Sequence, residues 1–116
     1  MFAKKNRLSR KAFNRFFASG ARSHTALVQL VYAPQTESAV TSFQVAVSVS
    51  KKVSKRAVDR NRLRRQCYAI ARSWHQETPL VGVYIMLVKP PALEADFGEL
   101  ESAVRSLLKK SYNKRS

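Results

Sequence analysis

The sequence predicts a single α+β domain with the element order αβββαβα, in which a four-stranded sheet is packed with helices. Its 116 residues are enough for one hydrophobic core, and 45% of them are hydrophobic, which is too many for a wholly disordered chain. Segments with the alternation of strands are interspersed with segments that have the period of helices. We therefore expect one domain over residues 1–116, with basic tails at about 1–6 and 113–116.

The first expected element is a short helix from Ser9 to about Gly20. Serine is suited to capping a first helical turn, and glycine to the residue that follows a helix. Phe13, Phe16 and Phe17 recur at a spacing that places them on one helical face. We expect Phe16 to lie in the core, and Phe13 and Phe17 to stay partly exposed.

Two strands are expected next, over Leu27–Ala33 and Phe43–Ser50, with a connection rich in Pro, Gln, Thr and Ser between them. The stretch from Leu27 to Ser50 accommodates either two strands or three, so the position of one strand is left open. Because side chains alternate along a strand, the second strand has a core face and a small, polar face. The core face holds Phe43, Val45, Val47 and Val49, and the other face holds Gln44, Ala46, Ser48 and Ser50.

A long helix is expected from about Ser54 to His75. Its apolar stripe is formed by Leu63, Cys67, Ile70 and Trp74. Arg56 and Arg60 fall on the same side as that stripe, so either the first turns overhang the core or the helix begins later than Ser54.

The last two elements are a strand and a helix. Val81–Val88 is a continuous apolar run of strand length. Asp96 and Glu99 have the spacing of a capping box, in which two side chains each bond a free backbone N–H at a helix start. The final helix is expected to bury Leu100, Val104, Leu107, Leu108 and Tyr112.

The charge of the chain is +15, from 22 Lys and Arg against 7 Asp and Glu, and it is unevenly distributed. Residues 1–22, 51–72 and 105–116 carry net charges of +7, +8 and +5, whereas 23–50 and 73–104 carry −1 and −4. This imbalance indicates a polyanionic partner, with nucleic acid the leading candidate. No apolar run approaches the roughly 20 residues that span a bilayer. The single cysteine excludes an internal disulfide and favours the cytoplasm.

The block 51–72 is the most informative, because it holds nine basic residues and one acid, Asp59. A helix face that serves only solubility usually mixes glutamate with lysine. Arginine suits phosphate, since its planar guanidinium donates two parallel hydrogen bonds. Asn61, between Arg60 and Arg62, is able to bond a base edge, a sugar or a phosphate. Composition alone does not separate RNA from DNA.

This stretch resembles the signature of the bacterial ribonuclease P protein subunit. The resemblance runs through Val49-Ser-Lys-Lys52, Ala57-Val58, Arg60-Asn-Arg62, Leu63 and Arg64-Arg65. Upstream, the family's first helix is matched by Asn6-Arg-Leu8 and the Phe13-x-x-x-Phe17-x-x-Gly20 pattern. Downstream, its last strand and last helix are matched by Val81–Lys89 and the basic C-terminal helix. Two departures concern local contacts: Lys55-Arg56 replaces a frequent Gly-Asn, and Tyr68-Ala69 replaces a frequent Arg-Glu.

The resemblance implies a cytoplasmic ribonucleoprotein that removes the 5′ leader from precursor tRNA. In that family the RNA subunit is the catalyst and Mg²⁺ serves the chemistry, so no cofactor bound by the protein and no obligate protein partner are expected. The family also has a left-handed βαβ crossover, with the Arg-Asn-Arg helix as the connection. This would break a rule of right-handedness that holds in about 98% of cases.

The resemblance also implies two sets of RNA-binding residues. Unpaired bases stack on aromatic rings, which suits a cleft for a single-stranded leader. Tyr32 of the strand Leu27–Ala33 is expected in this cleft, and a shift of one residue in the strand register would put Val31 there in its place. The expected docking set for the catalytic RNA is Lys51, Lys52, Lys55, Arg56, Arg60, Asn61, Arg62, Arg64 and Arg65, and the expected leader cleft is Phe13, Phe17, Tyr32 and Ser48.

The residues do not predict catalytic or metal-binding groups in the protein itself. His24 and His75 are isolated in sequence, and Cys67 lies on an apolar stripe, where a packed thiol is expected. The acids Glu94, Asp96, Glu99 and Glu101 surround a helix start, where they complement the helix dipole. The alternatives are a ribosomal protein, a stand-alone metal-dependent nuclease and a DNA-binding domain.

Overall fold

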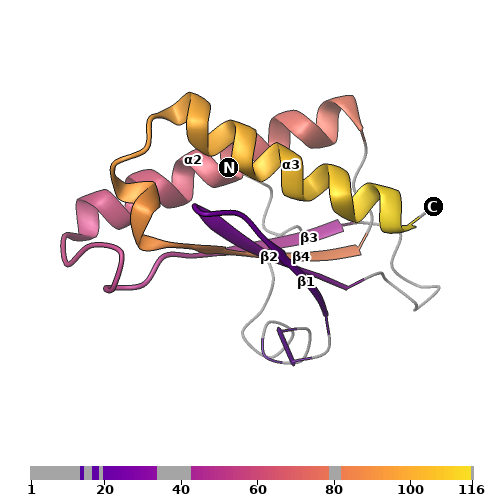
Figure 1. The fold of residues 1–116 in the computed structure, drawn as a ribbon, viewed down its shortest axis with the longest axis horizontal. Coiled ribbons are helices and arrows are strands. Elements are labelled where there is room, and N and C mark those ends of the chain that lie inside the picture. Colours follow the sequence, from indigo (N-terminus) through magenta and orange to yellow (C-terminus); the bar gives the residue numbers. More distant parts are fainter. Residues whose placement is uncertain (1–13, 15–16, 19, 34–42, 79–81, 116) are drawn as a thin grey trace.

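The computed structural model describes residues 14, 17–18, 20–33, 43–78 and 82–115, with only the backbone of 33, 43 and 112–115. Two long helices lie on the same side of a four-stranded sheet (Figure 1). This confirms the α+β class and the number of strands. The elements are β1 (Ala21–His24), β2 (Val28–Ala33), β3 (Phe43–Ser48), α2 (Ala57–Glu77), β4 (Gly82–Val88), the short 3₁₀ helix η2 (Pro90–Leu93) and α3 (Phe97–Arg115).

The sheet has the order β1-β2-β4-β3. β1 with β2 and β2 with β4 are antiparallel, whereas β3 and β4 are parallel and are connected by α2. β4 lies between β2 and β3, and its first five residues are all buried, which explains its continuous apolar sequence. The left hand expected for the β3–α2–β4 crossover stays a prediction.

The main core lies between the sheet and the two helices. Val45, Val47 and Val49 point into it, as the alternation along β3 predicts. Burial raises the pKa of the Cys67 thiol on α2 to about 12, so this thiol is protonated at neutral pH and packs as an apolar group. α2 also contributes Leu63, Tyr68, Ile70 and Ala71 to this core, and α3 contributes Leu100, Val104, Leu107 and Leu108.

The opposite side of the sheet, which we call the outer face, follows from the alternation of side chains and the strand register. At its centre Val31, Val83 and Ile85 form a second, smaller apolar cluster, on which Phe17 packs. The outer face consists of Arg22 and His24 of β1, Gln29 and Val31 of β2, Val83, Ile85 and Leu87 of β4, and Gln44, Ala46 and Ser48 of β3.

Two features differ from expectation. The strand whose position was left open is Ala21–His24, and it precedes the stretch from Leu27 to Ser50 where two or three strands were expected. It is an exposed edge strand, so its sequence lacks apolar alternation. The long helix begins at Ala57, the later of the two starts considered, because Ser54 is used in the turn before it. There the Ser54 hydroxyl accepts from the Arg56 N–H (3.1 Å) and donates to Asp59 (3.0 Å).

Other expectations fall on residues outside the described part of the chain. These include most of the first helix, Phe13, Phe16, the tail at about 1–6 and the side chain of Tyr112. The tail expected at about 113–116 is wrong in its bounds, because the backbone of residues 113–115 continues helix α3. Asn14, Phe17 and Ala18 are described, and all three are helical.

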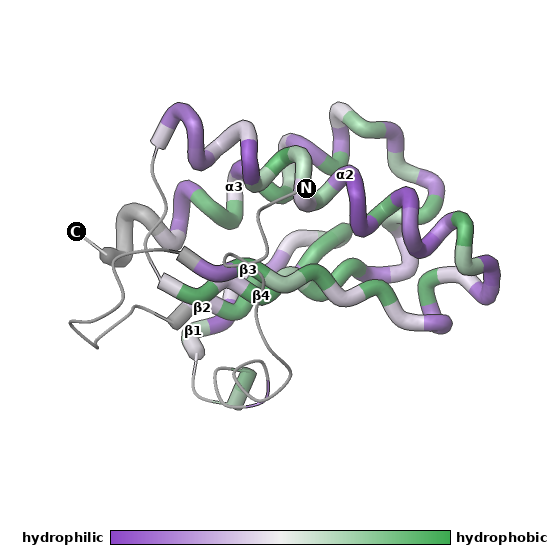
Figure 2. Tube along the Cα trace, turned by 180° about the vertical axis from the view of Figure 1, so that it is seen from behind, coloured by the Kyte–Doolittle hydropathy of each residue, from purple (hydrophilic) through white to green (hydrophobic). Residues whose placement is uncertain are grey.

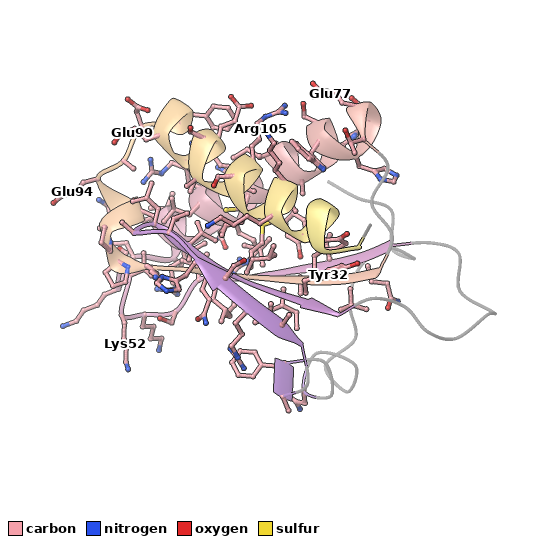
Figure 3. All side chains as sticks on the ribbon, turned by 45° about the vertical axis from the view of Figure 1, so that its right-hand side comes forward. Tyr32, Lys52, Glu77, Glu94, Glu99 and Arg105 are labelled. Carbon is pink, nitrogen blue, oxygen red and sulfur yellow. The ribbon has the colours of Figure 1, made fainter. Side chains whose placement is uncertain are left out.

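The start of α3 confirms the capping box. The Glu99 N–H donates to Asp96 Oδ1 (2.8 Å), and the Asp96 N–H donates to Glu99 Oε1 (3.3 Å). Further along, Arg105 of α3 donates to Glu77 (3.1 Å) and to Ser73 (3.1 Å) of α2. Figure 3 shows Arg105 and Glu77 reaching toward each other between the helices. The cap fixes the start of α3, and the bonds of Arg105 hold α3 against α2.

We predict that Asp96→Ala lowers the free energy of unfolding by about 1 kcal/mol, because a free N–H at the start of α3 loses its acceptor. Urea denaturation measures the loss. Glu94→Ala is the matched control: Glu94 is an exposed acid two residues earlier, and its removal should change stability by less than about 0.5 kcal/mol. Equal losses for both variants would show that the capping box does not stabilise the helix.

Candidate nucleic-acid interface

A tight basic turn joins β3 to α2. The Val53 N–H donates to the Ser50 carbonyl (3.0 Å), and the Lys52 N–H donates to the Ser50 hydroxyl (3.3 Å). Val53 is buried under the turn, which leaves Lys51 and Lys52 exposed at its tip. Figure 3 shows Lys52 extending away from the end of the sheet. Both lysines are therefore accessible to a polyanion.

The one acid of this block is engaged by its neighbours. Asp59 accepts from the Ser54 hydroxyl and lies 3.9 Å from Arg56 Nε. The side chain of Arg56 is still 76% exposed, so this ion pair does not remove it from the surface. Hydrophilic residues gather along the turn and the start of α2 (Figure 2). The negative charge of Asp59 thus orders the helix start and leaves the surface basic.

The arginines of α2 fall into two groups. Arg60 Nη1 donates to the Ser54 carbonyl (2.9 Å), and Arg62 Nη2 reaches the Leu93 carbonyl (3.5 Å), so both also hold the local structure. Arg65 is exposed, as is Asn61, whose side-chain oxygen accepts from Arg64 (2.7 Å). All nine residues of the expected docking set lie on the turn and the first turns of α2, and the most accessible are Lys51, Lys52, Lys55, Arg56, Asn61 and Arg65. Their role in docking stays a prediction.

Phe17 and Ser48 lie on the outer face of the sheet, and β3, which carries Ser48, leads into the basic turn. Phe17 is half-buried and packs on Val31, Val83 and Ile85 at the centre of the sheet. Ser48 belongs to a half-exposed strip on β3, together with Gln44 and Ala46. The chain passes from this strip directly into the lysine turn. Phe17 and Ser48 therefore share one face of the sheet, and their role in a leader cleft stays a prediction.

Tyr32 does not share this surface. It lies on the opposite side of the sheet, where it is 5% exposed and its ring centroid is 4.9 Å from that of Tyr84. Figure 3 shows it between the sheet and α3. The expectation that Tyr32 lines a cleft with Phe17 is wrong in its register, because Val31 is the residue of β2 that faces outward.

Sequence reasoning missed two cations of the outer face. Arg22 of β1 lies with its guanidinium carbon 4.5 Å from the centre of the Phe17 ring. Lys89 follows β4, and its ammonium donates to the Thr25 carbonyl (2.7 Å) and lies 3.3 Å from His24 Nδ1. β3 and β4 are parallel, so they end at the same edge of the sheet. Lys89 follows β4 at this edge, where the lysine turn follows β3. The sequence signal for Lys89 is that it is the single lysine or arginine of the acidic block 73–104.

Several carboxylates of the described residues are bonded within the fold. Asp96 and Glu99 form the capping box, and Glu77 and Glu101 contact Arg105. Within the described ranges, no group of three or more His, Cys, Asp or Glu residues is arranged to hold a metal ion. The helices described are also not long and apolar enough to cross a membrane.

Comparison with known proteins places the chain in one family. The family model of ribonuclease P matches residues 2–112. The chain belongs to the ribonuclease P protein family. The ribonuclease P protein component of Microcystis aeruginosa is 31% identical to it over 103 residues, which cover 88% of this chain and 86% of that protein. Membership implies RNA binding and a role in tRNA processing.

Solved ribonuclease P proteins share the fold. The Staphylococcus aureus protein superimposes with a TM-score of 0.81 at 20% identity, over 91% of this chain and 94% of that one. The Thermotoga maritima protein gives 0.78 at 19% identity, over 90% and 96%. The family assignment replaces the ribosomal-protein and DNA-binding alternatives.

The two departures from the family signature have different local settings. Lys55 and Arg56 are exposed in front of α2 and add to the basic surface. Tyr68 is buried in the main core, and Ala69 beside it is exposed. At the second departure, therefore, Tyr68 is a core residue of α2, and neither of the two residues carries a charge.

We predict that Arg60→Ala, Arg62→Ala and Arg65→Ala each weaken binding to the catalytic RNA. Each lost phosphate contact should make the log–log salt dependence shallower by about 0.7 to 0.9. Arg65→Ala should leave stability within about 0.5 kcal/mol, because Arg65 is exposed. Arg60→Ala and Arg62→Ala should also destabilise the fold, since each side chain bonds a backbone carbonyl.

Filter binding at several salt concentrations and urea denaturation measure the two effects. Lys110→Ala removes one exposed charge from α3 and is the control. Wild-type affinity and slope in all three arginine variants would exclude the start of α2 as the docking surface.

Proposed function

We propose that this chain is the protein subunit of a cytoplasmic ribonuclease P, which binds the catalytic RNA and the 5′ leader of precursor tRNA and promotes removal of the leader. The observation that carries the proposal is the position of the lysine turn. It connects the basic start of α2 with the outer face, so two RNA-binding surfaces meet there. Ribonuclease P RNA is the partner for the first surface, and precursor tRNA is the partner for the second.

The start of α2 suits docking on a folded RNA. Its cations lie on one rigid helix and one tight turn, and the Arg60 and Arg62 side chains are oriented by their bonds to backbone carbonyls. Cations held in this way lose less conformational freedom when they bind phosphates. Exposed Asn61 adds a side chain that both donates and accepts hydrogen bonds.

The outer face suits a single strand. Phe17 offers an aromatic ring on which unpaired bases are able to stack, on the same face of the sheet as the small residues of β3. The lysine turn offers positive charges to the phosphates. The bases of duplex RNA are already paired and stacked, so they are not free to stack on such a ring. The 5′ leader is the single-stranded part of precursor tRNA, and mature tRNA lacks it.

The chemistry of cleavage belongs to the RNA subunit in this proposal. The carboxylates named above bond Arg105 or cap the start of α3. Mg²⁺ at the RNA active site supplies the metal chemistry, and the cations of the protein reduce the repulsion between two polyanions. The purified protein without RNA is accordingly expected not to cleave precursor tRNA.

Phe17→Ala tests the leader assignment. In the reconstituted holoenzyme it should weaken affinity for precursor tRNA by roughly 1–3 kcal/mol, the value of one base stacked on an aromatic ring. Affinity for mature tRNA should hardly change. The stability of the protein should fall by less than the roughly 3–5 kcal/mol of a fully buried Phe→Ala change, because Phe17 is only half-buried.

Paired binding isotherms for precursor and product, with a urea melt, measure these effects. Phe97→Ala is the matched control, because Phe97 is an exposed phenylalanine at the start of α3. An equal loss of affinity for both tRNAs, or a large loss of stability with unchanged affinities, would show that Phe17 serves packing alone.

A further inference from the structure

Arg22 makes two contacts with Phe17, the residue on which the leader assignment depends. Arg22 Nη2 donates to the Phe17 carbonyl at 2.6 Å, and the guanidinium carbon lies over the Phe17 ring, 4.5 Å from its centre. A hydrogen bond and a cation–π contact thus act on the same residue. One restrains the backbone of Phe17 and the other restrains its ring.

The backbone contact has a clear physical cause. Phe17 and Ala18 are helical, and Gly20 lies in the bend that leads into β1. The Phe17 carbonyl therefore lies near the C-terminal end of these helical residues, where it accepts from Arg22. A guanidinium at this end satisfies the carbonyl and complements the negative end of the helix dipole.

The ring contact is set by the register of the sheet. Arg22 of β1 is opposite Val31 of β2, and Val31 is opposite Ile85 of β4. The Phe17 ring packs on Val31 and Ile85, and the guanidinium of Arg22 lies over one face of it. The ring is only half-buried, so its exposed part is what a base can contact. Arg22 itself is exposed, so RNA reaches it freely.

We propose that Arg22 is a positioning residue of the leader site, which holds the Phe17 ring in the orientation that meets single-stranded RNA. The inference rests on the proposed function, because the leader is taken as the ligand of Phe17. Arg22 acts through Phe17: it reduces the rotational freedom that the ring would lose on binding a base.

Methyl NMR of the free protein tests the positioning step without RNA. The Phe17 ring lies on Val31, Val83 and Ile85, so its ring current shifts their methyl resonances. Arg22→Ala should move these resonances toward the positions that they take in Phe17→Leu, where no ring is present. Arg22→Lys keeps a cation and a donor, so it should restore part of the shift. Methyl positions unchanged in Arg22→Ala would overturn the proposal.

Binding to the holoenzyme tests the functional step. Arg22→Ala should weaken affinity for precursor tRNA about fivefold to thirtyfold, which corresponds to one exposed cation–π contact and one charge at a helix end. Affinity for mature tRNA should hold. In the Phe17→Leu background, Arg22→Ala should have little further effect. Lys109→Ala, which removes an exposed charge from α3, is the control and should change neither quantity.

The outcomes separate this inference from the proposed function. An Arg22 effect that persists in full without the Phe17 ring would mean direct binding of Arg22 to phosphate, and it would overturn the positioning role. If Phe17→Ala weakens precursor binding and Arg22→Ala does not, the leader site stands and the role of Arg22 falls. If Phe17→Ala does not discriminate between precursor and product, the leader site itself is wrong, whatever the methyl spectra show.

Discussion

The parallel pairing of β3 with β4 is the constraint on which the rest of the structure depends. Two parallel neighbours need a long connection, and α2 provides it by packing Leu63, Cys67 and Ile70 on the sheet. The pairing also brings the ends of both strands to one edge. Lys51 and Lys52 follow β3 there, and Lys89 follows β4. Basic residues from separate charge blocks are thereby collected by backbone geometry.

A second consequence is that the two faces of the sheet differ in what covers them. α2 and α3 both lie on one face, where they bury the main core and hold each other through Arg105 (Figure 1). The outer face keeps a small apolar centre under Phe17 and a strip of small residues on β3. The proposed function therefore assigns docking and leader binding to different surfaces that join at one turn.

Local patterns predicted those elements whose partners lie close in sequence or whose periodicity is strong. The valine face of β3, the stripe of α2 and the Asp96–Glu99 box are examples. β1 was not located, because an exposed edge strand needs no apolar alternation. Alternation groups Tyr32 with Leu30 and Val28, yet only the placement of α3 shows that this group faces the core. Arg62 bonds a carbonyl 31 residues away, which no local pattern reveals.

The central claim is that leader and catalytic RNA bind different surfaces, and crosslinking tests it most directly. A holoenzyme loaded with precursor tRNA that carries photoreactive nucleotides in its leader is irradiated, and the labelled peptides are identified by mass spectrometry. The account predicts adducts on the outer face and the lysine turn, at residues such as Phe17, Ser48 and Lys52. Adducts concentrated on Asn61 and Arg65 of α2, with the outer face unlabelled, would contradict it.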